Sequence, residues 1–189
     1  MPVALLRAFL RMKTGTALVR SPTMSAGASR SENAPSRPVL GWREWTALPE
    51  LGVSRIKVKV DTGARSSALH AFAIRREEVN GETWLRFKIH PIQKDSRSTV
   101  EARARMVDER SVRSSSGQQS SRPVVVSPVL IGSDRWPIEI TLVRRDLMGF
   151  RMLLGRQAVR GRYLVDPGRS FLRGEPDPEQ LHRAPEAPA

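Results

Sequence analysis

The chain has 189 residues, no cysteine and a formal net charge of +13, from 32 basic and 19 acidic residues. This length fits one domain with flexible ends. The absence of cysteine excludes a disulfide framework, a cysteine nucleophile and a cysteine-based zinc site, and it agrees with a protein of the reducing cytoplasm. No apolar run is long enough to span a membrane. The basic charge favours an acidic peptide, anionic lipid or nucleic acid as partner, but an arginine-rich solvated surface explains it equally well.

Composition divides the sequence into three regions. Residues 1–37 are rich in Ser, Ala, Arg and Pro without sustained periodicity, so we predict a disordered basic extension. Residues 38–174 carry the strand patterns, and residues 175–189 form a proline-rich tail that we also expect to be disordered. The apolar start does not fit a signal peptide, because arginines interrupt it and no clear cleavage site follows; Met24 is an alternative initiator.

Apolar and polar residues alternate with period two in four stretches of the middle region, which is typical of strands with one face on a core. In chain order these stretches are Ile56–Val60, Leu85–His90, Val100–Met106 and Ile138–Leu142. Asn80–Gly81 predicts a hairpin turn. More continuous apolar runs at Val124–Ile131 and Met152–Leu154 indicate buried strands, and the one short helix that we expect lies at Gln157–Val159. The class is therefore all-β, and a small closed barrel fits it best.

The strand Ile56–Val60 runs directly into Asp61, which places a carboxyl group at the end of a core strand. The Thr62 hydroxyl can fix the following turn, Gly63 permits close backbone approach, and Ala64 leaves room beside the carboxyl group. A plain turn aspartate is the alternative interpretation, because Asp and Gly are common turn formers. Taken alone, the segment does not decide between a catalytic acid and a turn.

The Asp-Thr-Gly-Ala segment behind an apolar strand resembles the active-site loop of retropepsins, and Met152–Arg156 resembles the late apolar-glycine motif of that fold. Lys59–Ala71 is similar to a bacterial family of retropepsin-like aspartic endopeptidases associated with the RimK glutamate ligase (RimB-like), which also bears the name ATP-dependent zinc protease. Further similar stretches are Val112–Gly117, Ile138–Leu142, Arg145–Arg156 and Gly161–Pro167. The resemblance covers residues 39 to 173 or so.

The resemblance implies one lobe of an acid-protease barrel per chain, with Asp61, Thr62 and Gly63 as the catalytic residues. Aspartic peptidases use two carboxyl groups that share one proton, one activating a water and the other polarising the scissile carbonyl. Because the chain has a single Asp-Thr-Gly, the second Asp61 has to come from a symmetric partner. The expected assembly is a homodimer with the site on its twofold axis.

The zinc and ATP in the family's other name do not fit the residues. Catalytic zinc needs about three protein ligands and an open position. The chain has only His70, His90 and His182, without a His-Glu-x-x-His motif. It also lacks the Gly-x-x-x-x-Gly-Lys-Ser/Thr loop that holds ATP phosphates. We therefore expect no metal site and no cofactor.

The association with a glutamate ligase implies a peptide or protein substrate such as a glutamate-tailed ribosomal protein, and arginine pairs well with carboxylates. The candidate substrate-binding residues are Ala64, Arg65, His70, Arg113 and Ser115. A surface ion pair is the alternative role for the two arginines. A hydrogen-bonded structural role is favoured for the histidine, and the serine belongs to a loop that is either a plain turn or lines the substrate.

Three other interpretations stay open. The chain could be a non-catalytic β-barrel that binds an acidic protein or a ribosomal partner. A basic strand face with Lys57, Lys59, Arg103 and Arg105 could bind RNA, but aromatic residues for base stacking are sparse there, so nucleic acid is disfavoured. The hairpin Val79–Glu82 is a candidate for the flap over the site. The four tryptophans are assigned to core or edge packing.

Overall fold

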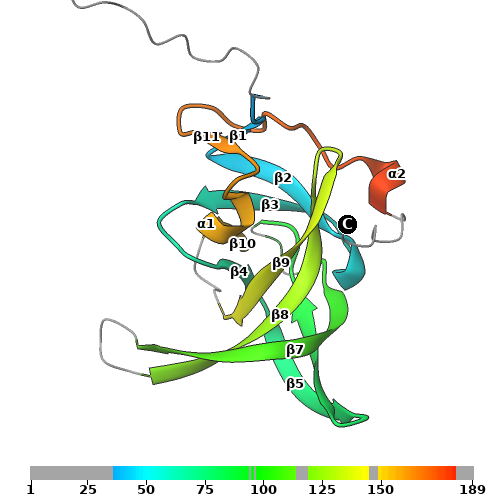
Figure 1. Cartoon of the computed structure of the whole chain (residues 1–189). Coiled ribbons are helices and arrows are strands. Elements are labelled where there is room, and N and C mark those ends of the chain that lie inside the picture. Colours follow the sequence, from blue (N-terminus) through cyan, green and yellow to red (C-terminus); the bar gives the residue numbers. More distant parts are fainter. Residues whose placement is uncertain (1–35, 94, 96, 114–118, 145–148, 182–189) are drawn as a thin grey trace, which may run out of the picture. The chain divides into compact units, whose positions relative to one another are not determined.

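The computed structural model describes residues 36–93, 95, 97–113, 119–144 and 149–181. The chain divides into two units after Pro35, and all described residues lie in the second unit, so the disorder predicted for residues 1–37 concerns residues almost wholly outside the description. Strands dominate, and the structure confirms the all-β class (Figure 1). The described helices are three or four residues long, so none of them could cross a membrane.

The elements follow one another with short connections. The strands are β1 (Val39–Gly41), β2 (Arg43–Leu48), β3 (Val53–Asp61), β4 (Ser67–His70), β5 (Phe72–Val79), β6 (Glu82–Ile89), β7 (Val100–Arg113), β8 (Gln119–Ile131), β9 (Asp134–Val143), β10 (Met152–Gly155) and β11 (Leu164–Asp166). The helices are the 3-10 turn η1 (Pro49–Leu51), α1 (Arg156–Val159) and α2 (Pro178–Leu181).

Six strands close a barrel in the order β2, β3, β10, β4, β9, β8, and the pair Ala47 and Leu130 joins β8 back to β2. The sheet continues from β8 through β7 and β6 to β5, while β1 and β11 form a separate parallel pair. β10 lies between β3 and β4, parallel to the first and antiparallel to the second. The predicted small closed barrel is therefore confirmed.

The core follows the alternation seen in the sequence. On β3 the inward residues Ile56, Val58 and Val60 are buried, and the intervening residues face outward. The same period places Leu85, Phe87 and Ile89 of β6 in the core. Burying one such side chain fully contributes about 1.5–3 kcal/mol, so each strand of this kind is anchored mainly by its inward face.

The predicted hairpin turn and helix are present. Asn80 and Gly81 join β5 to β6, with φ values of 52° and 79°. Both values lie in the left-handed region that a two-residue type I′ turn requires, which explains why asparagine and glycine stand there. The short helix expected at Gln157–Val159 is α1, which begins one residue earlier.

A C-terminal strap, residues 168–177, runs beside β2. Trp42 N donates to Arg169 O at 2.9 Å and Phe171 N donates to Arg43 O at 2.9 Å. The fully buried Glu44 carboxylate of β2 accepts from the backbone N–H groups of Gly41 (2.6 Å), Leu172 (3.0 Å) and Arg173 (3.3 Å). Because those donors satisfy it, a charged residue lies in the interior and ties the strap to the barrel.

The strap continues into residues that the sequence assigns to a disordered tail. Pro176 is buried, and Asp177 N donates to Gly132 O at 3.2 Å just before α2. Residues 175–181 thus have defined neighbours on the barrel, whereas residues 182–189 lie outside the description. The division at residues 38 and 175 itself stays a prediction.

Candidate active site

The loop after β3 fixes the orientation of the Asp61 carboxylate. Its Oδ1 accepts from Gly63 N at 3.2 Å and from Ala64 N at 3.1 Å. These two bonds form a local turn in which the aspartate side chain stands in for a backbone acceptor. Asp61 is half-buried, and Thr62 and Gly63 are exposed. The carboxylate is therefore held rigidly at the end of a core strand while the loop beyond it faces solvent.

The parallel pairing of β3 with β10 supports this loop. Asp61 is the register partner of Gly155, where β10 ends. A Cβ on Gly155 would lie 2.3 Å from Ser66 C and 2.4 Å from Ser66 O, so only glycine fits there. Gly155 N also donates to Ser67 Oγ at 3.2 Å. The late apolar-glycine motif thus provides the close backbone approach that keeps the Asp61 loop in place.

The next residue, Arg156, holds the loop with its side chain as well as its backbone. Its N–H donates to Ala64 O at 2.8 Å, and Nη1 donates to Thr62 O at 2.8 Å and Gly63 O at 3.3 Å. Sequence reasoning placed this arginine in a motif but gave it no role. The available signal was its position directly after the glycine of that motif.

The other sequence-based candidates divide into two groups. Ala64 is half-buried and Arg65 exposed, and both belong to the Asp61 loop. His70 lies elsewhere: it is fully buried at the far end of β4, three residues beyond Ser67, which corresponds to about 10 Å of strand. Arg113 ends β7, far along the chain from the loop, and Ser115 lies outside the described residues. Among the described candidates, Ala64 and Arg65 therefore lie in the same loop as Asp61.

His70 belongs to a ring cluster with Phe72 and His90. The Phe72 and His90 ring centroids are 4.4 Å apart, and His70 lies 6.0 Å and 6.1 Å from them. His70 N also donates to Arg151 O at 2.7 Å. This packing agrees with the structural role that the sequence favoured for this histidine. Its assignment to substrate binding stays a prediction that the geometry does not support.

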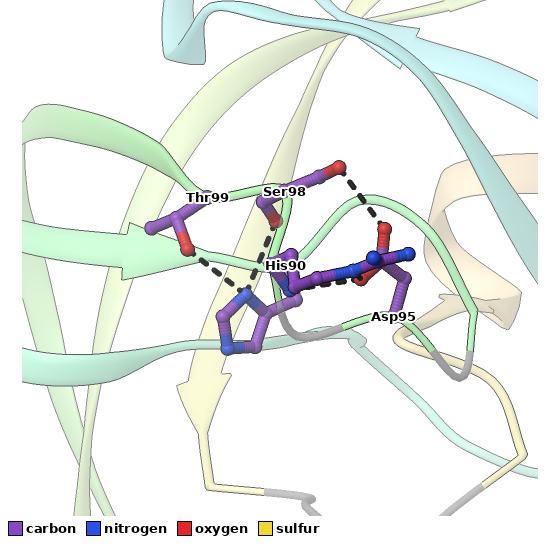
Figure 2. Close-up of polar contacts among 5 residues, drawn as sticks. His90, Asp95, Ser98 and Thr99 are labelled. Carbon is purple, nitrogen blue, oxygen red and sulfur yellow. Dashed lines mark hydrogen bonds and ion pairs between the residues drawn. The ribbon is translucent and has the colours of Figure 1, made fainter.

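Polar contacts join His90, Asp95 and residues 97–99 in the segment after β6 (Figure 2). His90 Nδ1 lies 3.2 Å from Ser98 O and 3.3 Å from Thr99 Oγ1. Asp95 accepts from Arg97 N at 2.8 Å and Ser98 Oγ at 3.1 Å, and the Arg97 backbone N–H in particular lowers the pKa of its carboxyl group. These contacts are local to the loop and build no catalytic set with Asp61.

Asp134 and Asp166 make contacts away from the Asp61 loop, and Asp146 lies outside the described residues. Asp134 accepts from the Tyr163 hydroxyl and from Arg173 Nη2, and burial, reinforced by Asp134, raises the pKa of Tyr163. Asp166 Oδ1 accepts from Gly168 N at 2.8 Å in a turn after β11. Within the described ranges, no three His, Cys, Asp or Glu side chains gather closely enough to hold a metal ion.

In this barrel the late strand β10 passes between the two strands that flank the Asp-Thr-Gly loop, which is the arrangement expected of a retropepsin-like lobe. The family model described as "RimB-like: Retropepsin-like aspartic endopeptidase RimB" matches residues 39–176. The chain therefore belongs to the RimB-like family, as its resemblance predicted.

Curated relatives carry a different activity in their names. A probable alpha-L-glutamate ligase of Shewanella pealeana is 44% identical over 137 residues, which is 72% of this chain and 30% of that protein. One of Desulfotalea psychrophila is 40% identical over 149 residues, 79% of this chain and 32% of that protein. The chain thus spans about a third of the length of the curated relatives it matches.

A solved structure has the same fold. The crystal structure of a Legionella pneumophila protein of unknown function has a TM-score of 0.63 and 27% identity, covering 73% of this chain and 99% of that one. The likeness supports the barrel architecture, and the name assigns no activity to either chain.

Proposed function

We propose that the protein is an aspartic-type endopeptidase that hydrolyses peptide bonds with a water activated between two copies of Asp61. The observation that carries this proposal is the Asp61 loop, whose two backbone N–H groups orient the carboxylate at 3.2 Å and 3.1 Å on the scaffold of a retropepsin-like lobe. An oriented carboxylate at the end of a strand is what a general acid or base requires.

One lobe supplies half of the chemistry. Acting as general base, one carboxylate takes a proton from the water that attacks the scissile carbonyl. The other, protonated, donates a hydrogen bond to the carbonyl oxygen. Because the chain has a single Asp-Thr-Gly, the second carboxylate in the proposal is Asp61 of a partner subunit. A homodimer with its twofold axis at this loop satisfies the requirement.

The proposed substrate is a protein with a glutamate tail, such as a glutamate-tailed ribosomal protein. Two facts support it: the curated relatives are named as glutamate ligases, and the chain carries a net charge of +13. A chain that pairs with carboxylates through arginine and lysine suits such a tail. A non-catalytic barrel that binds the same tail is the second candidate, favoured by the basic residues beside Asp61 on β3.

The test compares cleavage of a glutamate-tailed peptide by the wild type and by Asp61→Asn. The amide oxygen of asparagine can still accept both backbone N–H bonds, so the fold is retained, whereas cleavage should fall by at least about a hundredfold. Asp166→Asn is the matched control, because it changes an aspartate in a similar turn away from β3. Equal cleavage by wild type and Asp61→Asn would reject the proposal. A chelator that abolishes cleavage would restore the zinc interpretation.

A mixing experiment tests the shared dyad. Equal amounts of wild type and Asp61→Asn, allowed to exchange subunits, should retain about a quarter of the activity of an all-wild-type sample, because only a quarter of random dimers hold two Asp61 residues. Independent monomers would retain half. Sedimentation of the wild type at the assay concentration shows whether the dimer is populated.

A further inference from the structure

We infer that three outward cations of β3, namely Arg55, Lys57 and Lys59, form a binding track for successive carboxylate side chains of an acidic peptide, with Lys59 selecting the side chain nearest the scissile bond. We name these residues the β3 cation row. The inference deepens the proposed function and rests on it for the role of Asp61. Binding of an acidic tail by the row can nevertheless be measured without catalysis.

The row shares one strand face with the proposed catalytic residue. Side chains along a strand alternate between faces, and on β3 Ile56, Val58 and Val60 point into the core. The cation row and Asp61 therefore all point outward, in steps of two residues. The row ends at Lys59, two residues before Asp61, so a chain bound at the carboxylate has its neighbouring side chains over Lys59.

The ammonium group of Lys59 is available to an incoming carboxylate. It is exposed and, within the part of the chain that the structure describes, makes no ion pair or side-chain hydrogen bond. Its cross-strand neighbours on that face are Arg43 of β2 and Leu153 of β10. Arg43 is already held, with its guanidinium 4.7 Å from the Trp42 ring and 5.0 Å from the Phe171 ring and with Nε donating to Ser170 Oγ.

The other two cations lie along a groove. Arg55 and Lys57 both lie over the Trp45 ring, 3.8 Å and 4.9 Å from its centroid. Together with Trp45, Ser54 and residues 91–93 they line a groove of about 410 Å³. Among the described residues, the carboxylate that pairs with the row is that of Glu175, 2.9 Å from Arg55. Both partners of that pair are about half exposed, so an incoming carboxylate can replace Glu175.

The spacing of the row fits an extended chain. Residues two apart on one face of a strand are about 6.8 Å apart, and the side chains on one face of an extended peptide repeat at the same distance. The distance from Arg55 to Asp61 is about 20 Å, the length of roughly six extended residues. Six consecutive glutamates could thus present one carboxylate to each cation while the chain reaches Asp61.

The experiment measures binding in the Asp61→Asn background, so that the peptide stays intact. Fluorescence anisotropy compares a labelled peptide bearing six glutamates with the same peptide bearing six glutamines. Lys59→Met should weaken binding of the glutamate peptide roughly fivefold, and Lys57→Met with Lys59→Met roughly thirtyfold, because each exposed pair contributes modestly. Binding of the glutamine peptide should not change. Lys59→Arg should restore the affinity to within about threefold.

The matched control is Lys88→Met, which removes a lysine from a strand face of β6 where it pairs with Glu101. It should change affinity less than twofold. Equal losses in Lys59→Met and Lys88→Met would reduce the effect to net charge and overturn the inference. So would equal wild-type affinity for the glutamate and glutamine peptides. Tighter binding of a single-stranded RNA oligomer than of the glutamate peptide would also overturn it.

Cleavage separates this inference from the proposed function. If the wild type cleaves no peptide but Lys59→Met still loses affinity for the glutamate tail, the row stands and the endopeptidase proposal fails. If the wild type cleaves both peptides alike and Lys59→Met cleaves as the wild type does, hydrolysis stands and the row is overturned.

Discussion

Apolar and basic residues alternate on β3 and on parts of β6 and β7, which with β5 form the last three strands of the nine-stranded sheet (the β5–β7 sheet), yet the charges of these two regions have different neighbours. On the sheet, Glu77 pairs with Arg86 at 2.9 Å and with Arg103 at 3.3 Å, and Glu101 and Glu82 pair with Lys88 and Arg105. On β3 the single paired cation is Arg55 among the described residues. The basic side chains of the β5–β7 sheet are thus neutralised by acidic side chains on neighbouring strands, whereas most of those on β3 stay available to a ligand. The cross-strand partners determine this difference.

The two regions also differ in what holds them together. Around Asp61, strands β2, β3 and β10 depend on buried backbone contacts, such as those of Gly155 and Glu44. The β5–β7 sheet adds exposed ion pairs to its ladder, and such pairs contribute about 0–1 kcal/mol each. Substitutions at these buried contacts should therefore be costly, and substitutions in the exposed ion pairs of the sheet should be nearly neutral.

The largest effect should come from Gly155→Ala. The added Cβ would collide with the backbone of Ser66 and Ser67, which cannot rotate away, so we expect a loss of about 3 kcal/mol in the free energy of unfolding. Gly149→Ala is the control, since its Cβ would meet nothing within 4 Å, and it should change stability by less than about 0.5 kcal/mol. Denaturant unfolding measures both, and similar values for the two would contradict the comparison.

The same substitution can be made in both regions. Glu44→Gln places an amide donor against buried N–H groups that now donate to a carboxylate, and it should cost about 2 kcal/mol. Glu77→Gln removes a half-exposed partner of Arg86 and Arg103 and should cost less than about 1 kcal/mol. A larger loss of unfolding free energy for Glu77→Gln than for Glu44→Gln, measured by urea unfolding, would contradict this comparison of the two regions.

Arg156→Gln tests whether the loop is held for catalysis rather than for stability. Without the two guanidinium bonds to Thr62 O and Gly63 O, the loop loosens around Asp61. We expect kcat to fall about tenfold, with KM changing less, because a positioning residue acts on the reacting geometry. Stability should change by less than about 1 kcal/mol, since the arginine is exposed. An unchanged kcat would show that the backbone bonds of α1 are sufficient, and Arg156→Lys should give an intermediate rate.

The smallest predicted effect is on the pH dependence of stability. The hydrogen bond from Lys88 and then its charge lower the pKa of the exposed Glu101 on the sheet. A lowered folded-state pKa means that this contribution is present above the unfolded value and is lost as the pH falls through the folded value. The melting temperature of Glu101→Gln should therefore lie slightly below that of the wild type at about pH 6 and converge with it near pH 3. Lys88→Met should show the same convergence.

Local signals predicted the parts of the fold that depend on neighbouring residues. The alternation at Ile56–Val60 and Leu85–His90 gave strands, and Asn80–Gly81 gave the turn, because period and turn chemistry are short-range properties. The three-residue strands β1 and β11 carry too few residues for a period to be visible. Their pairing depends on partners more than a hundred residues away along the chain.

The burial of polar residues was harder to predict from the sequence than the strands and the turn. Glu44 has the sequence context of a surface acid, and its interior position depends on N–H groups of the distant C-terminal strap. His70 follows Asp61 by nine residues and was grouped with it, but the direction of β4 carries it to the opposite end of the strand. Nearness in sequence fails as a guide wherever a strand intervenes, because each residue adds about 3.3 Å.

The insertion of β10 between β3 and β4 has a consequence for folding. Met152 pairs with Val58 and Leu69. The two strands that flank the Asp61 loop can therefore complete their pairing only with a segment about 90 residues later in the chain, and closing such a long loop is slow. During synthesis the nascent barrel has an unfilled slot next to Asp61 until β10 leaves the ribosome. The loop then gains its support from Gly155 and Arg156 late in folding, so under the proposed function a partly folded chain would have no organised site with which to cleave itself or its neighbours before the barrel closes.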